Sequence, residues 1–62
     1  MKAGFVGLGA MGWHMAAHLA EKNLLGAVWN RTAATATKFS IEYSVPAVAN
    51  PADLWAHCDT VI

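Results

Sequence analysis

The sequence has few of the features that usually stabilise a small domain, such as disulfides, or that bind a charged partner, such as blocks of basic residues. Its 62 residues include one cysteine, Cys58, so no disulfide can form within the chain. Charged residues make up 13% of the chain, and the formal net charge is zero, with no block of lysine and arginine to meet nucleic-acid phosphates. No apolar run approaches the about 18 uninterrupted residues of a membrane span. We therefore expect neither nucleic acid nor a membrane as a partner.

Metal and thiol chemistry find little support either. His14 and His18 stand four residues apart in a predicted helix, a spacing that can hold zinc, but no third ligand accompanies them. Cys58 has no cationic neighbour in sequence, which favours a buried, inert thiol over a nucleophile. We expect no metal site and no catalytic residue within this chain.

What the chain does have is apolar surface, because 56% of its residues are hydrophobic. A body of this size buries only about 60% of its unfolded surface, so we expect some of that surface to meet further chain. We interpret the sequence as a fragment of a larger protein. Its first twenty residues loosely resemble a secretory signal, but four glycines and two histidines interrupt the apolar run. We expect a cytoplasmic protein.

Strand and helix patterns alternate along the chain. Apolar residues at helical spacing, Met11, Met15 and Leu19, with Ala16 and Gly12 beside them, predict the apolar face of the first helix. That helix should end near Lys22, with Asn23 as a left-handed cap. The predicted strands are 3–6, 27–29, 44–49 and 60–62, and the predicted helices are 10–22, 33–42 (capped by Thr32) and one from 51. This order predicts an α/β fold, a Rossmann-type doubly wound parallel sheet present only as a partial β-α-β-α-β-α-β unit.

The turn between the first strand and the first helix reads GLGAMG, with glycines spaced as in a dinucleotide-binding loop. Gly7 allows a tight turn, Gly9 lets a pyrophosphate approach the backbone, and Gly12 allows close packing of helix and sheet. The amides at the start of the helix would face the phosphates. The predicted cofactor-binding residues of this loop are the three glycines, Gly7, Gly9 and Gly12, together with the amides at the start of the helix.

The residues after the second predicted strand indicate which dinucleotide would bind. Domains built for NAD usually carry a carboxylate there, whereas this chain has Asn30, Arg31 and Thr32. Asn30 can bond a ribose oxygen without charge, and the planar guanidinium of Arg31 suits a 2′-phosphate. We expect NADP as the cofactor, read by these three residues.

The stretches GFVGLGAMGWHMAAHL, VWNRT and NPADLWAHCDTVI together resemble the N-terminus of the β-hydroxyacid dehydrogenase family. That family includes 3-hydroxyisobutyrate dehydrogenases and, more distantly, 6-phosphogluconate dehydrogenases. The resemblance implies hydride transfer between a nicotinamide cofactor and a small 3-hydroxy acid or semialdehyde. It also implies that the backbone of Leu8, Gly9, Ala10 and Met11 lines the pyrophosphate of the cofactor. Residues 1–62 would then form the N-terminal part of an NADP-binding domain. The rest of that domain and a helical substrate domain would lie outside this chain, in a protein that forms a homo-oligomer.

The chain departs from the family pattern at Thr35, where a lysine is common, and we expect Lys38 to replace that lysine in part. Three alternatives stay open. An imine reductase shares the glycine pattern and an NRT-like segment. A nucleotide-sensing or interaction module would use the same domain without chemistry, and a truncated gene product would not fold.

Overall fold

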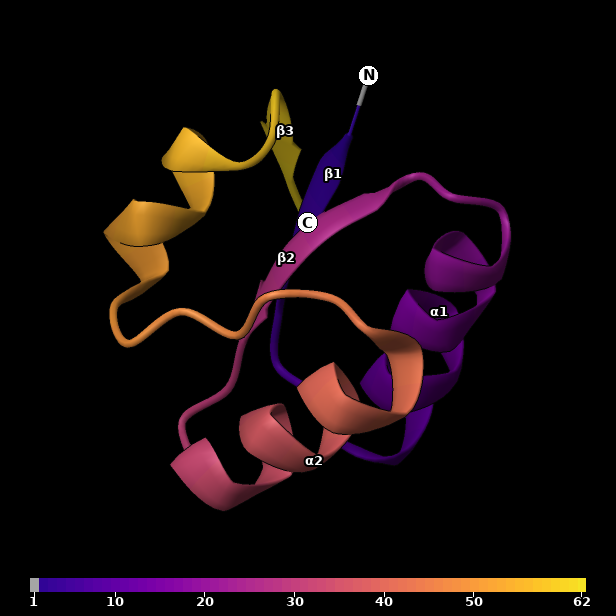
Figure 1. Cartoon of the computed structure of the whole chain (residues 1–62). Helices are drawn as coiled ribbons and strands as arrows, with labels where there is room; N and C mark the ends of the chain where they lie inside the picture. The colour runs from indigo at the N-terminus through magenta and orange to yellow at the C-terminus, as the bar shows by residue number, and fades with distance from the viewer. Residues whose placement is uncertain (1) are drawn as a thin grey trace.

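The computed structural model describes residues 2–62, so Met1, the first residue of the predicted domain, lies outside the described residues. The elements are β1 (Ala3–Val6), α1 (Ala10–Glu21), β2 (Leu25–Trp29), α2 (Ala33–Tyr43), the 3₁₀ helix η1 (Pro51–Ala56) and β3 (Thr60–Val61). The strands are parallel and lie in the order β2-β1-β3. The helices α1 and α2 cover one face of this sheet and η1 covers the other (Figure 1). This arrangement confirms the predicted fold class.

The predicted strand 44–49 forms one isolated bridge to β2 instead of a regular strand. Ala47 forms an isolated parallel bridge with Val28 of β2. The Val28 amide donates to the Pro46 carbonyl at 2.9 Å, and the Val48 amide donates to the Val28 carbonyl at 3.0 Å. The segment therefore lies at the predicted sheet edge, outside β2, but it is not a regular strand. Pro46 has no amide hydrogen to extend a ladder, which limits the pairing.

The predicted helix that begins at Pro51 is a 3₁₀ helix, not an α-helix. Asn50 precedes it without a side-chain capping bond, and the Asp53 amide donates to the Asn50 carbonyl at 3.0 Å, an i→i+3 bond. A 3₁₀ helix rises about 2.0 Å per residue against about 1.5 Å in an α-helix, so a short segment reaches further. Leu54 is fully buried beneath the sheet and attaches η1 to its face.

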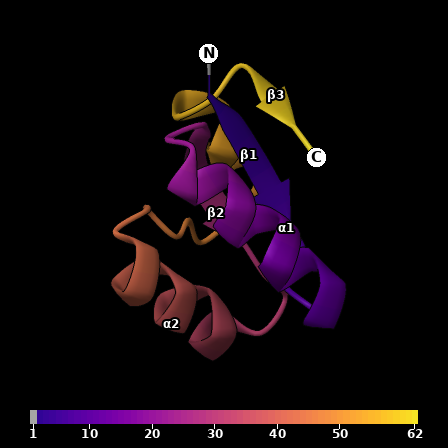
Figure 2. The ribbon, with the colours of Figure 1, turned by 90° about the vertical axis from the view of Figure 1, so that its right-hand side faces the viewer.

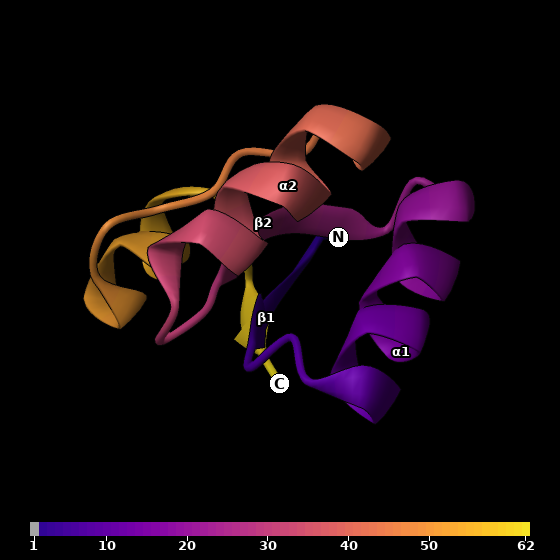
Figure 3. The ribbon, with the colours of Figure 1, turned by 90° about the horizontal axis from the view of Figure 1, so that it is seen from below.

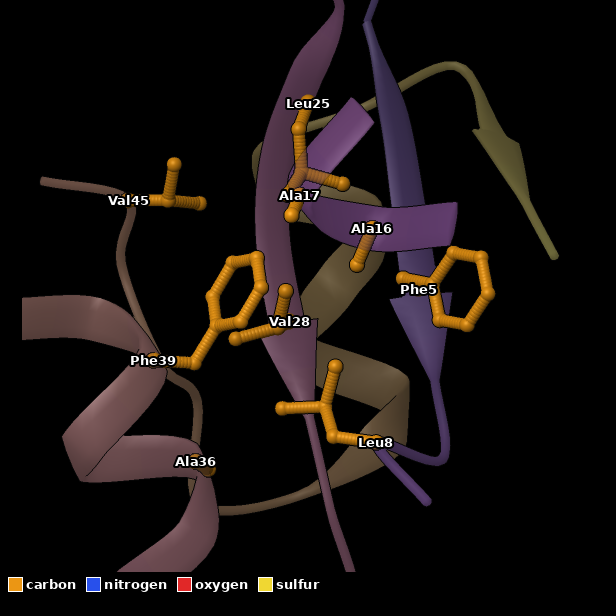
Figure 4. Packing of buried hydrophobic residues seen from close by; sticks show 9 residues of the cluster. All are labelled: Phe5, Leu8, Ala16, Ala17, Leu25, Val28, Ala36, Phe39 and Val45. Atoms are coloured by element: carbon orange, nitrogen blue, oxygen red, sulfur yellow. The ribbon is translucent and has the colours of Figure 1, made fainter. Parts of the chain in front are cut away.

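The hydrophobic core lies between the sheet and the two α-helices (Figure 4). Phe39 of α2 and Val28 of β2 are fully buried in it, and the Trp13 ring meets that of Phe39 edge-on with centroids 4.9 Å apart. Figure 2 shows α1 in front of the sheet and η1 behind it. The core thus fixes the end of β2 and the start of α1 relative to each other.

The predicted apolar face of α1 is confirmed at Ala16 and wrong at its two methionines. Met11 is 79% exposed and Met15 is 53% exposed, whereas Ala16 and Ala17 are buried against the sheet. Small alanine side chains let the helix axis approach the strands closely, so the larger methionines lie on the opposite side. Leu19 of the predicted face packs partly against the core.

Both α-helices end in a residue with left-handed backbone. Asn23 has φ 59°, as predicted, and Ser44 has φ 57°. After α1 the Asn23 amide donates to the Ala20 carbonyl at 3.0 Å, and the Leu24 amide donates to the Leu19 carbonyl at 2.9 Å. This is the Schellman arrangement, which satisfies the last carbonyls of the helix and turns the chain directly into β2.

Candidate nucleotide-binding site

The glycine loop lies at the carboxyl end of β1, where the sheet order reverses between β1 and β3 (Figure 3). Ligands of open α/β sheets bind in the crevice at such a point. Gly7 has φ 92°, a conformation that side chains disfavour, and its amide donates to the Trp29 carbonyl at 3.0 Å. The tight turn expected at Gly7 is therefore present, and it is tied to the end of β2.

The two other glycines of the loop stand in opposite surroundings. A Cβ atom at Gly12 would lie far inside van der Waals contact of the Gly7 carbonyl oxygen and 3.4 Å from a ring carbon of Phe5. The close packing expected at Gly12 is thus observed. A Cβ atom at Gly9 would meet nothing within 4 Å, and Gly9 has an ordinary extended backbone with φ −67°. Packing within the chain does not explain a glycine at position 9.

Amides at the start of α1 are available to a ligand. The first bond of the helix runs from the Trp13 amide to the Gly9 carbonyl at 2.8 Å. Among residues 2–62, no backbone carbonyl accepts from the amides of Ala10 or Met11. The N-terminus of a helix carries a partial positive charge and unpaired N–H groups, so this end suits an anion.

The Leu8 amide, by contrast, is already engaged. It donates to Asn30 Oδ1 at 2.7 Å, and the Leu8 side chain is buried in the core. Asn30 Nδ2 donates to the Thr32 carbonyl at 3.1 Å. These two partners fix the orientation of the Asn30 amide, because an N–H must meet its oxygen and a carbonyl must meet its nitrogen. One lone pair and one N–H of Asn30 remain for a ligand.

Arg31 is exposed and lines a hollow of about 270 Å³ at the end of β2. The rest of its lining comes from the end of β2 and the residue after it, from α2, and from the segment 47–49 beside β2: Trp29, Asn30, Ala33, Ala36, Thr37, Ala47, Val48 and Ala49. None of the four acidic residues of the chain is among them. The hollow therefore offers a guanidinium without a competing carboxylate.

The other two predicted residues take different places. Thr32 occupies the N-cap position of α2, as expected, but its side chain forms no capping hydrogen bond. Lys38 is exposed on α2 and does not line the hollow, where Thr37 of the same helix does. Lys38 therefore lies outside the hollow, on the helix that forms part of its wall.

The two histidines and the cysteine considered in the sequence lie in separate places. His14 and His18 border an apolar hollow of about 420 Å³ beside α1, and residues 2–62 contain no group of three metal-binding side chains. Cys58 is half-buried, and its thiol donates to the Leu54 carbonyl at 2.9 Å. In the described part of the chain, no helix is long and apolar enough to cross a membrane.

Sequence reasoning missed two features of this site. The bond between Leu8 and Asn30 joins residues 22 positions apart, and the lining by Ala47–Ala49 comes from a segment expected only as a strand. The parallel register that places Val6 opposite Trp29 could have revealed the first, because it puts residue 30 beside the glycine loop. Nothing local in the sequence indicates the second.

Comparison with known proteins agrees with this geometry. Residues 2–62 match the family described as the NAD binding domain of 6-phosphogluconate dehydrogenase. A solved structure of UDP-N-acetylglucosamine 3-dehydrogenase from Acidithiobacillus ferrooxidans is similar, with 28% sequence identity and a TM-score of 0.89. The similarity covers 98% of this chain and 20% of that one, so the chain spans about a fifth of that dehydrogenase. No curated protein matches the chain.

The matched family is one of domains that bind a nicotinamide dinucleotide. It agrees with the 6-phosphogluconate dehydrogenase-like part of the expected resemblance and with an oxidoreductase's nucleotide-binding role. The chain belongs to the family of NAD-binding domains of 6-phosphogluconate dehydrogenase.

Proposed function

We propose that the chain is the NADP-binding part of an oxidoreductase of the β-hydroxyacid dehydrogenase type. The whole protein transfers hydride between the nicotinamide and a small 3-hydroxy acid or semialdehyde. Residues 1–62 supply the N-terminal part of the cofactor domain. The rest of that domain and the helical substrate domain, with the catalytic residues, belong to other parts of the protein.

The open backbone at Gly9 carries the proposal that a dinucleotide binds here. Space for a side chain at Gly9, next to the unpaired amides of Ala10 and Met11, fits a pyrophosphate held by the backbone. Gly7 and Gly12 support this cradle by shaping the turn and the helix start. Leu8 contributes by anchoring, since its amide is engaged with Asn30. When bound, the cofactor supplies or accepts the hydride through its nicotinamide ring.

The residues at the end of β2 support NADP as the cofactor in preference to NAD. Arg31 lines the hollow there, and no acidic residue does. A guanidinium that donates charge-assisted hydrogen bonds to a 2′-phosphate contributes about 1.5–3 kcal/mol, or about 10- to 150-fold in affinity. The remaining N–H of Asn30 and the α2 start at Thr32 would meet the ribose and its phosphate. Lys38, which lies outside the hollow, adds a further positive charge.

The test is the affinity of the full-length gene product for NADPH and for NADH, measured by calorimetry with and without Arg31→Ala. We expect a preference for NADPH that falls by about 10- to 150-fold in Arg31→Ala, while NADH binding is unchanged. Lys38→Ala is the matched control, since it removes one cation outside the hollow and should lower NADPH affinity less. Equal affinity of the unaltered protein for both nucleotides would refute the NADP assignment.

The proposal extends to substrate, location and assembly. A turnover panel of small semialdehydes, 3-hydroxy acids, cyclic imines and UDP-N-acetylglucosamine separates the proposed enzyme from an imine reductase and from the activity of the similar structure. Nucleotide binding without turnover of any substrate would favour a sensing or interaction module. We further propose a cytoplasmic homo-oligomer, which fractionation and light scattering test.

A further inference from the structure

The glycine loop has a held half, Gly7 and Leu8, whose amides form hydrogen bonds within the chain, and an open half that begins at Gly9. On the held side, the Gly7 amide donates to the Trp29 carbonyl, the Leu8 amide donates to Asn30 Oδ1 at 2.7 Å, and the Leu8 side chain is 4% exposed. On the open side, a Cβ atom at Gly9 would touch nothing within 4 Å. The open half therefore takes its position from the held half.

Asn30 is the side chain that holds the loop at Leu8, the last residue of the held half. It is half-buried, follows β2 directly, and forms hydrogen bonds in two directions. One end accepts from the loop at Leu8, and the other donates to the Thr32 carbonyl at the N-cap of α2. Its amide therefore connects the loop that would hold the pyrophosphate to the segment that contains Arg31.

We infer that Asn30 is a positioning residue that sets the glycine loop for the pyrophosphate, in addition to any contact with the ribose. This inference rests on the proposed dinucleotide function. Pyrophosphate is common to NADH and NADPH, so a residue that positions the loop affects both nucleotides. Arg31, which we propose contacts the 2′-phosphate, affects NADPH alone. Although Asn30 and Arg31 are adjacent in sequence, Asn30 affects the binding of both nucleotides, whereas Arg31 affects the binding of NADPH.

The experiment compares Asn30→Ala with Arg31→Ala in the full-length gene product, using three probes: inorganic pyrophosphate, NADH and NADPH. We expect Asn30→Ala to weaken pyrophosphate binding by about 5- to 30-fold, the loss of one well-made hydrogen bond, and to weaken both nucleotides by at least that factor. We expect Arg31→Ala to weaken NADPH alone. Loss of nucleotide binding in Asn30→Ala with pyrophosphate binding unchanged would overturn the inference, because Asn30 would then act on the ribose.

A second readout does not depend on any ligand. Hydrogen exchange of the Leu8 amide, followed by NMR, should accelerate at least 5-fold in Asn30→Ala. Asn30→Asp keeps an oxygen for that amide, so Leu8 should stay protected while the new charge lowers NADPH affinity. Asn30→Asp also serves if Asn30→Ala does not fold. Unchanged Leu8 exchange in Asn30→Ala would refute the positioning role.

The two readouts separate failure of this inference from failure of the proposed function. If the unaltered protein bound no nucleotide and no pyrophosphate, the proposed function would fail and with it the role in positioning a ligand. Leu8 exchange would still report whether Asn30 holds the loop. If nucleotide bound normally and Leu8 exchange did not respond to Asn30→Ala, only the inference would fail.

Discussion

Gly9 and Gly12 lie three residues apart on the same helix start, and the structure predicts opposite outcomes for the same substitution. In Gly9→Ala the new methyl group enters open space, on a backbone with φ −67° that any residue adopts. In Gly12→Ala the methyl group meets the Gly7 carbonyl group, with its carbon 3.2 Å away. Gly9→Ala should therefore weaken nucleotide binding without changing stability, and Gly12→Ala should lower the stability of the fold.

The magnitudes follow from these surroundings. For Gly12→Ala, the overlap is with backbone atoms that cannot move aside, so overpacking costs about 2–3 kcal/mol, the upper part of the usual range, offset by about 1 kcal/mol of helix propensity. The net loss of about 1–2 kcal/mol lowers the unfolding midpoint by about 2–8 °C in a domain of 150–250 residues. For Gly9→Ala, a poorer N-cap and a less flexible unfolded chain act in opposite directions, each by under about 1 kcal/mol. We expect a stability change within about 0.5 kcal/mol.

The assay pairs thermal unfolding with NADPH titration for both variants of the full-length gene product. Gly9→Ala should unfold as the unaltered protein does, yet bind NADPH about 10- to 150-fold more weakly, because the methyl group separates the pyrophosphate from its amide donors. Normal NADPH affinity in Gly9→Ala would refute the backbone cradle. An unchanged midpoint in Gly12→Ala would refute the close approach of α1 to the Gly7 turn.

Two further predictions concern stability alone. Phe39 is fully buried and forms a T-shaped contact with the Trp13 ring, so Phe39→Ala should lower the free energy of unfolding in urea by about 3–5 kcal/mol. A loss below about 1 kcal/mol would show that this core is loosely packed. Asn23 has φ 59°, so Asn23→Ala should cost about 1 kcal/mol while Asn23→Gly costs less, and equal losses in thermal unfolding would contradict a left-handed requirement there.

The sequence predicted the elements whose signals are local. The strand Ala3–Val6 was predicted with its observed bounds, and the second helix was predicted one residue short of its end at Tyr43. The left-handed cap at Asn23 was also predicted. Each depends on residues a few positions apart, such as a short apolar run, a glycine turn or a cap. Local sterics and hydrogen bonding decide such features before distant parts of the chain meet.

The errors arose where a segment's fate depends on its neighbours in space. Met11 and Met15 fit a helical apolar stripe, but the sheet accepts the alanine side of α1 because only small residues allow the close contact. The segment 44–49 is extended as predicted, yet its pairing is limited to one bridge with β2. Periodicity shows that a face is apolar without showing which face the sheet will bury.

For the site, the sequence by itself determined the glycine turn, the helix start and the absence of a carboxylate after β2, because these are matters of residue type and order. Only the tertiary structure decided that Asn30 holds the Leu8 amide, that Gly9 faces open space and that Arg31, not Lys38, lines the hollow. Those features depend on the register of β1 against β2 and on the helices packed over them. Such contacts join residues about 20 positions apart, and only the packed chain brings them together.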